Sequence, residues 1–330
     1  MPRTERSITR NGVPIYTLRS NDFEVVRLTF VFRAGTSMQH KPFTASATAN
    51  MLGEGSQTMS AQQIADKLDF YGSYFDVNID RDYSYISFCS LKKFFEPTAE
   101  VASEIILSPT FPEKELGVYC SKRKQSLTIE RKKIDMQSRE LFSEALFGKH
   151  HPYGISSNEA LYDELTRKDI VALYRELYTA DNAFIVCSGN IDDKVLNTIT
   201  HIAEALPKGE CREVVFPQAV TTHAMCRNID TALQSSIRIG RLLFKRTHPD
   251  FVGMQVVPPG PRPPSHRNAV HRTEPYRRYV YDFPHQNIVY ITFHPTFQSH
   301  WKLVYQWCIY LFTLCRMKSC FCKLIRNIVC

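Results

Sequence analysis

Five prolines stand among the seven residues from Pro258 to Pro264, and this cluster limits most strongly how the chain can fold. Proline lacks a backbone N–H and fixes its own φ angle, so such a run continues neither a helix nor the ladder of a sheet. The charge changes at the same place. Ten of the 41 basic residues but only two of the 33 acidic residues follow position 257, whereas basic and acidic residues balance before it. The chain therefore joins two different compositions.

The charge balance before residue 258 removes the reason to expect a nucleic acid or a membrane as partner, which the net charge of +8 alone would give. The first ten residues lack the apolar run of a secretory signal. The most apolar stretch, 303–315, is 13 residues long, shorter than the roughly 20 that cross a bilayer. Scattered single cysteines before residue 258 suit a reducing compartment. We therefore expect a cytoplasmic protein.

Apolar periodicity predicts an α+β fold, a mostly antiparallel sheet covered by helices. Ser60 and Gln63 form a predicted capping box at the start of one helix, and the turn 79–82 predicts a hairpin. The predicted strands are 13–18, 23–33, 74–78, 83–91 and 181–188. The predicted helices are 42–52, a helix from Ser60, 98–107, a long helix over 113–147, 158–165, 168–178 and 194–206.

The domain organisation that we expect has four parts. Residues 1–210 form a complete domain, and 211–219 form a linker. Residues 220–257 repeat the order of a long apolar strand (232–244) and a helix (248–257), which suggests an incomplete second copy of the first domain. Residues 258–330 form a proline-rich, basic, cysteine-rich tail of doubtful fold, in which we suspect a shifted reading frame or a truncated gene. Sequencing the gene across codon 258 tests that suspicion.

Several segments together carry a resemblance to a known family. They are 27–34, 44–52, 60–76, the Ser-Pro-Thr-Phe-Pro turn at 108–112, the stretch Phe-Gly-Lys-His-His-Pro-Tyr-Gly at 147–154 and Ser-Gly-Asn at 188–190. Over residues 10–257 the sequence resembles the insulinase-type zinc peptidases, which include pitrilysin and the mitochondrial processing peptidase subunits. The resemblance implies a metallopeptidase-like domain followed by a homologous second one.

In this family zinc is held by a His-x-x-Glu-His motif on the first helix. The two histidines lie one turn apart and both reach the metal, and the glutamate polarises the attacking water. Anchored by Met51-Leu52 and the glycines that follow, this sequence has Ser46 and Asn50 at the histidine positions and Ala49 at the glutamate position. None of these side chains can replace those that the motif requires. We therefore expect no catalytic residue, no bound metal and no cofactor.

The family's third ligand is a glutamate farther along the chain, and Glu130 is its best match. It shares one face of the predicted long helix with Leu127 and Ile134, which suggests an inward-pointing carboxylate. The alternative is an ion pair with Arg131 or Lys133 on a partly solvated face. In either case a single carboxylate does not hold zinc, so Glu130 is a vestigial position.

Other motifs offer weaker candidates. His150 and His151 are adjacent and cannot chelate together, so we expect His151 to be structural. Residues 53–56, Gly-Glu-Gly-Ser, are a helix stop rather than a phosphate loop, because they lack its lysine. Cys315, Cys320, Cys322 and Cys330 match no zinc module. The family's substrate-binding Arg-Tyr pair is not assigned to Arg277, Arg278, Tyr279 or Tyr281, because prolines replace the Gly-Gly turn that precedes the pair.

The resemblance implies a function as well. Many members work in pairs in which one subunit carries the zinc and a related one has lost it. We expect this chain to be such a catalytically inactive homologue, a partner or peptide-binding subunit of an active zinc metalloendopeptidase in a hetero-oligomer. The alternatives are an active peptidase with an unrecognised metal site, a binding module that uses the basic tail, and a non-functional gene fragment.

Overall fold

The computed structural model of the chain describes residues 4–155, 158–210, 217–222, 225–229, 236–242, 249, 276–281 and 288–293. The chain divides into two compact units. The first comprises Met1–Leu127 and Ser157–Val215, and the second Thr128–Ser156 and Phe216–Cys330. The expected domain 1–210 differs from this division in one respect, because residues 128–156 group with the second unit.

The first unit is built on one six-stranded sheet. Its strand order is β1-β2-β6-β3-β5-β4, and every neighbouring pair is antiparallel except β2 with β6. The strands are β1 (Thr4–Ile8), β2 (Pro14–Arg19), β3 (Val25–Phe32), β4 (Tyr74–Ile79), β5 (Ser84–Leu91) and β6 (Ala183–Gly189). This sheet confirms the predicted α+β class, and the predicted hairpin is β4 with β5.

The described residues contain seven α-helices, which are interspersed with the strands along the chain. They are α1 (Thr44–Met51), α2 (Ala61–Phe70), α3 (Phe95–Leu107), α4 (Glu113–Glu130), α5 (Ile134–Phe147), α6 (Arg167–Leu177) and α7 (Asp193–Glu204). Short 3-10 helices lie at Leu52–Glu54, Lys92–Phe94, Glu159–Tyr162 and Ala180–Asn182. The Glu159–Tyr162 turn is all that forms of the helix predicted over 158–165.

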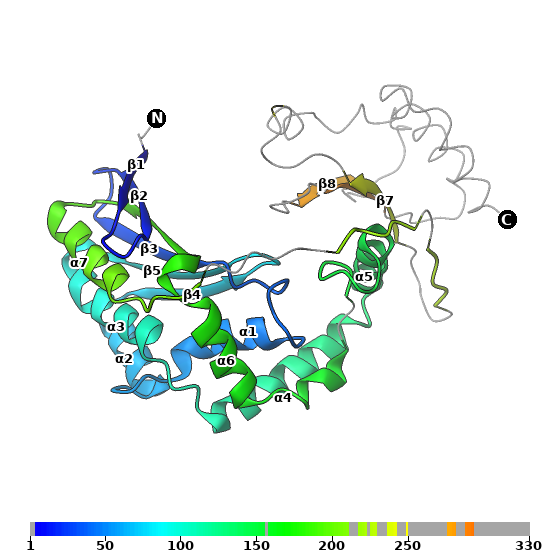
Figure 1. Cartoon of the computed structure of the whole chain (residues 1–330), viewed down its shortest axis with the longest axis horizontal. Coiled ribbons are helices and arrows are strands. Elements are labelled where there is room, and N and C mark those ends of the chain that lie inside the picture. The colour runs from blue at the N-terminus through cyan, green and yellow to red at the C-terminus, as the bar shows by residue number, and fades with distance from the viewer. Residues whose placement is uncertain are drawn as a thin grey trace, which may run out of the picture. The chain divides into compact units, whose positions relative to one another are not determined.

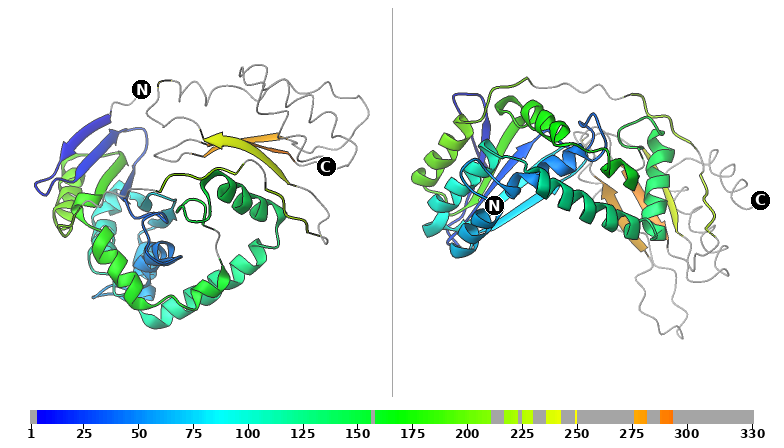
Figure 2. Two further views of the ribbon diagram at one scale, coloured as in Figure 1. Left: turned by 45° about the vertical axis from the view of Figure 1, so that its right-hand side comes forward. Right: turned by 90° about the horizontal axis from the view of Figure 1, so that it is seen from below.

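Within the first unit the helices cover one face of the sheet, as Figure 1 and the view from below in Figure 2 show. Val26, Leu28, Phe30 and Phe32 alternate along β3 and are buried on that face, whereas Arg27 between them is exposed. They join one apolar core that includes residues of α1, α2, α3, α6 and α7. Burying this alternating face against helices accounts for the layered arrangement.

The predicted capping box is present. Ser60 accepts a hydrogen bond from the Gln63 backbone N–H, and the Gln63 side chain accepts one from the Ser60 backbone N–H at 2.8 Å. Thr166 and Asp169 form a second capping box at the start of α6. These side chains satisfy backbone donors that the first turn of a helix leaves without partners.

The single long helix predicted over 113–147 is wrong. Two helices replace it, α4 and α5, and the Lys133 backbone between them is extended (φ −77°, ψ 126°). The residues at the break, Arg131, Lys132 and Lys133, include neither proline nor glycine. The Gln137 side chain donates a hydrogen bond of 2.9 Å to the Arg131 carbonyl, which supplies a partner that the break would otherwise remove.

The second unit contains a three-stranded antiparallel sheet of order β7-β9-β8, made of β7 (Ile237–Leu242), β8 (Tyr276–Tyr281) and β9 (Ile288–Phe293). Two of these strands lie in 258–330, the tail whose fold the sequence left in doubt. Both are rich in aromatic and β-branched residues, which favour strands. The proline cluster and the four C-terminal cysteines lie outside the described residues, as does the predicted helix 248–257 apart from residue 249.

Also in the second unit, the end of α5 carries a small apolar cluster. Leu146, Phe147 and Tyr153 are buried together, with Ala219 and Leu242 packed against them. The backbone N–H of Val220 donates to the Phe147 carbonyl at 3.2 Å. Among the residues that the structure describes, no helix is both long and apolar enough to cross a membrane.

Candidate functional site

Helix α1 carries the positions at which the resemblance places the metal motif. The helix begins after Phe43, whose φ of 66° is unusual for a residue other than glycine. The Phe43 ring is stacked on Tyr162 with the ring centroids 4.0 Å apart, and the preceding Lys41 pairs with Asp169 at 3.0 Å. These contacts fix the start of α1 against the segment that leads into α6.

At the three motif positions, two side chains form hydrogen bonds with the backbone at α1, and the third side chain is buried. The Ser46 hydroxyl donates a hydrogen bond of 3.0 Å to the Phe43 carbonyl. The Asn50 side-chain amide donates one of 2.7 Å to the Ser46 carbonyl. Ala49 between them is fully buried. Ser46 and Asn50 use their side chains to bond the backbone of their own helix, and Ala49 offers no polar atom.

Tyr119 of α4 lies next to Ser46. Burial raises the pKa of the Tyr119 hydroxyl, and the neighbouring Ser46 hydroxyl and the Arg123 guanidinium oppose that rise. The two hydroxyls are close enough to interact, although the geometry falls short of a well-formed hydrogen bond. Tyr119 was missed from the sequence because a search for a metal ligand on this helix looks for a carboxylate. The α4 side chain beside the motif position is a protonated phenol.

Glu130, the residue matched to the family's third ligand, is not the α4 residue that lies next to Ser46. It is the last residue of α4 and is exposed, and its carbonyl accepts the Lys133 N–H at 2.9 Å. The expectation that it points inward on one face with Ile134 is wrong, because the helix ends at Glu130. Arg131, one of its expected ion-pair partners, lies 4.0 Å from Glu140.

Residues 53–56 form the predicted helix stop. The 3-10 turn Leu52–Glu54 ends at Gly55, whose φ of 144° suits glycine alone. The Ser56 hydroxyl accepts hydrogen bonds from the backbone N–H groups of Thr58 and Met59. Burial raises the pKa of Glu54, the carboxylate of Glu115 adds to the rise, and Lys122 opposes it.

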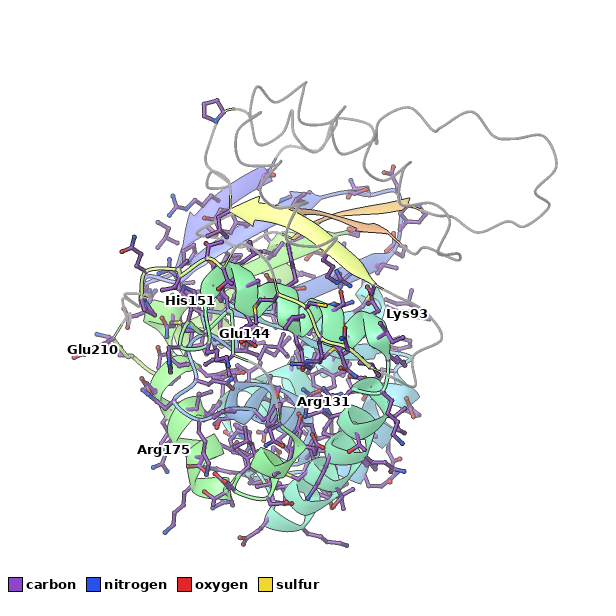
Figure 3. The ribbon with its side chains drawn as sticks, turned by 90° about the vertical axis from the view of Figure 1, so that its right-hand side faces the viewer. Lys93, Arg131, Glu144, His151, Arg175 and Glu210 are labelled. Atoms are coloured by element: carbon purple, nitrogen blue, oxygen red, sulfur yellow. The ribbon has the colours of Figure 1, made fainter. Side chains whose placement is uncertain are left out.

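His151 has the structural environment that we expect. It is buried beyond the end of α5, its ring is stacked on Phe147 at 4.9 Å, and its Nδ1 accepts the Tyr153 backbone N–H at 3.0 Å (Figure 3). His150 beside it is exposed. Arg277, Arg278, Tyr279 and Tyr281 lie in β8, where only the backbone is described.

The residues at the motif positions do not fit zinc. A tetrahedral site needs imidazole, thiolate or carboxylate ligands, and α1 offers a hydroxyl and an amide, both donating to its backbone. Across the described part of the chain, no group of three His, Cys, Asp or Glu side chains is arranged to hold a metal ion.

Comparisons with known proteins identify what the chain is similar to. No protein-family model matches it. Two curated proteins named uncharacterized zinc protease, from Rickettsia felis and Rickettsia bellii, are each 20% identical to it over 206 residues, which cover 61% of this chain and 50% of each relative. The chain thus matches about half the length of these relatives.

Solved structures share the fold at low sequence identity. A peptidase M16 inactive domain from Pseudomonas fluorescens has a TM-score of 0.78 and 21% identity, covering 88% of this chain and 74% of that one. A protease from Helicobacter pylori has a TM-score of 0.77 and 11% identity, covering 99% and 84%. An M16-like peptidase from Alicyclobacillus acidocaldarius has a TM-score of 0.73 and 10% identity, covering 99% and 82%.

Proposed function

We propose that this chain, which has the fold of the M16, insulinase-type peptidase domains and weak sequence homology to zinc proteases, is a non-catalytic subunit that works beside a zinc-bearing peptidase. The resemblance found in the sequence is confirmed at the level of the fold. The loss of activity and the partner role are the proposal.

One observation carries the proposal. Helix α1, on which the resemblance places the family's metal motif, is firmly packed, and positions 46, 49 and 50 hold a serine, a buried alanine and an asparagine. Without the two imidazoles there is no metal-bound water, and without the glutamate there is no group at that place to accept a proton from one. The scaffold is kept and the groups that perform hydrolysis are replaced.

The fold does not need a metal to hold α1. Thr48 donates to the Thr44 carbonyl at 2.8 Å, the Gln39 side chain accepts the Ala45 N–H at 3.1 Å, and Ala47 and Met51 belong to the apolar core. A stable M16 fold without a hydrolytic centre can contribute a surface to an assembly, which is the role that zinc-less members have in this family. The P. fluorescens structure that it resembles is likewise described as an inactive domain.

The experiment isolates the tagged chain from its native source and assays the eluate with a quenched fluorescent peptide. We expect hydrolysis that a chelator abolishes, with zinc and activity following a second polypeptide of M16 sequence when the subunits are separated. Material from the same source without the tag, taken through the same purification, is the control. Activity that stays with this chain after separation would contradict the proposal, as would an eluate that contains no M16 partner.

A further inference from the structure

The C-terminal end of α5 is covered by a segment from much later in the chain, and this contact has no part in the function proposed above. The segment 217–222 donates three hydrogen bonds to consecutive carbonyls of the helix. They run from the Val220 N–H to Phe147 at 3.2 Å, from the Thr221 hydroxyl to Leu146 at 3.1 Å and from the Thr222 N–H to Ala145 at 2.7 Å. Since the last carbonyls of a helix have no partner within it, this segment caps α5.

His151 lies just beyond this end of α5 and contacts the same part of the helix (Figure 3). It is 6% exposed, and its ring is stacked on the Phe147 ring with the centroids 4.9 Å apart. Its Nδ1 accepts the Tyr153 backbone N–H at 3.0 Å, and its carbonyl accepts the Gly154 N–H at 2.8 Å. Phe147 therefore contacts the histidine through its ring and the segment 217–222 through its carbonyl.

The hydrogen bond to Nδ1 determines the charge of the His151 ring. A backbone N–H can only donate, so Nδ1 must keep its lone pair, and the ring is neutral in this arrangement. A proton on Nδ1 would place two donors 3.0 Å apart, and it would charge a ring that is almost completely buried. The closed turn 148–154 therefore accommodates the neutral imidazole and excludes the imidazolium.

The surroundings of His151 contain charges that belong to ion pairs and a helix end that attracts a proton. In the described part of the second unit, the titratable groups near this end of α5 or on the strand packed against the helix are Glu144 paired with Lys149 at 3.5 Å, Arg238 of β7 paired with Asp135, the exposed His150, and Tyr153. The segment 217–222 has no charged residue. The C-terminal end of α5 carries a partial negative charge, which favours an imidazolium once the turn opens.

We propose that His151 makes the contact between α5 and the segment 217–222 sensitive to pH. At neutral pH the unprotonated ring keeps the turn 148–154 closed and supports Phe147. In mild acid the opened turn takes up a proton that the closed turn excludes. Because the open form then binds more protons, its population rises as the pH falls, and the segment 217–222 separates from α5.

Hydrogen exchange of the full chain, followed by mass spectrometry at pH 7.5 and pH 5.5, tests the proposal. The readout is the protection of the peptide that contains Val220 and Thr222, corrected for the intrinsic effect of pH on exchange. An imidazole titrates near pH 6.5, so we expect protection to fall about tenfold at one pH unit below that value. Unchanged protection would overturn the proposal, and so would an equal fall in the peptides of β5, which would indicate general unfolding.

Two variants assign the effect to His151. His151→Asn retains an acceptor for the Tyr153 N–H but cannot titrate, so its protection should be the same at both pH values. His150→Asn is the matched control, because it removes the exposed neighbouring imidazole, and it should keep the tenfold fall. A fall of the same size in His151→Asn would contradict the proposal.

A measurement on the unaltered chain does not depend on how the variants fold. Nuclear magnetic resonance of the chain labelled with ¹⁵N-histidine distinguishes the two neutral tautomers, and contacts with the Phe147 and Tyr153 rings identify His151. We expect the proton on Nε2 at neutral pH and protonation of Nδ1 over the same pH interval in which protection falls. A proton on Nδ1 at neutral pH would overturn the proposal.

Discussion

The side chains of α1 show how a metal motif can be absent while the helix that carries it stays intact. Ser46 and Asn50 lie one turn apart, as the two histidines of the motif would, and each donates to a backbone carbonyl one turn before it. Short polar side chains do this readily in helices. Ala49 between them is covered completely, so the place of the general base is occupied by packing.

Replacing Ala49 tests this description. Ala49→Glu places a carboxylate where no water reaches and no partner is provided, so we expect the free energy of unfolding to fall by about 3 kcal/mol or more. Asn50→Glu, at the exposed neighbouring position, should change it by about 0.5 kcal/mol or less. Urea denaturation measures both. Equal stability of the two variants would show that position 49 faces solvent, as a catalytic glutamate must.

The sequence alone predicts those features of the candidate site that depend only on which residue type occupies a position. At the positions where the resemblance places the motif, a serine, an alanine and an asparagine offer no good zinc ligand, and this prediction needed no structure. Which α4 side chain lies beside Ser46 was not readable, because it depends on where α4 begins and ends. The choice of Glu130 assumed one continuous helix, whereas α4 ends at Glu130 and its earlier residue Tyr119 lies beside Ser46.

Among the elements, those with strong local signals were predicted well. The capping box at Ser60, the hairpin of β4 and β5 and the glycine stop at Gly55 follow from a few adjacent residues. The break between α4 and α5 has no proline or glycine to announce it. At the break the Gln137 side chain donates to the Arg131 carbonyl, an interaction that only the folded arrangement provides.

Tyr174 of α6 forms a hydrogen bond to α3, and the pH dependence of stability tests this contact. Its hydroxyl donates to the Ile106 carbonyl at 2.6 Å, and burial raises its pKa from 10.0 to about 12. Between these two values the unfolded chain loses the proton and the folded chain keeps it, so stability falls as the pH rises through this interval. We expect Tyr174→Phe to make that fall shallower and to cost about 1 kcal/mol at neutral pH.

Urea midpoints measured from pH 8 to pH 12 check the Tyr174 prediction. The exposed Tyr74→Phe variant is the matched control. We expect the Tyr174→Phe variant to retain part of the fall in stability with pH, because burial also raises the pKa of Tyr178. If stability falls with pH as steeply in Tyr174→Phe as in the unaltered chain, the Tyr174 hydroxyl is solvated.

At the scale of the whole molecule, most strands and helices up to about residue 206 were predicted in the right order, although strand β1 and the break between α4 and α5 were missed. The grouping of segments into units was not readable. Periodicity places each segment in an element, but it does not say which segments pack together. Residues 128–156 lie between parts of the first unit in sequence and nevertheless pack with residues of the second. The cluster of Leu146, Phe147 and Tyr153 with Ala219 and Leu242 accounts for this grouping.

Truncating the chain tests its division into two compact units. The main apolar core runs from Val13 to Leu206, so a chain that ends at Glu210 should keep a cooperative thermal transition by near-ultraviolet circular dichroism. The same chain loses Ala219 and Leu242, so the buried end of α5 becomes exposed and should bind a hydrophobic dye that the full chain does not bind. Loss of the cooperative transition would contradict an independent first unit.

The central claim is that an M16 fold is present here without its metal chemistry. The most direct measurement is the zinc content of the purified chain after incubation with zinc and gel filtration, alongside peptide hydrolysis with and without a chelator. We predict far less than one zinc per chain and no hydrolysis in either condition. One tightly bound zinc per chain together with chelator-sensitive cleavage would contradict the account and would mean that other residues form the catalytic site.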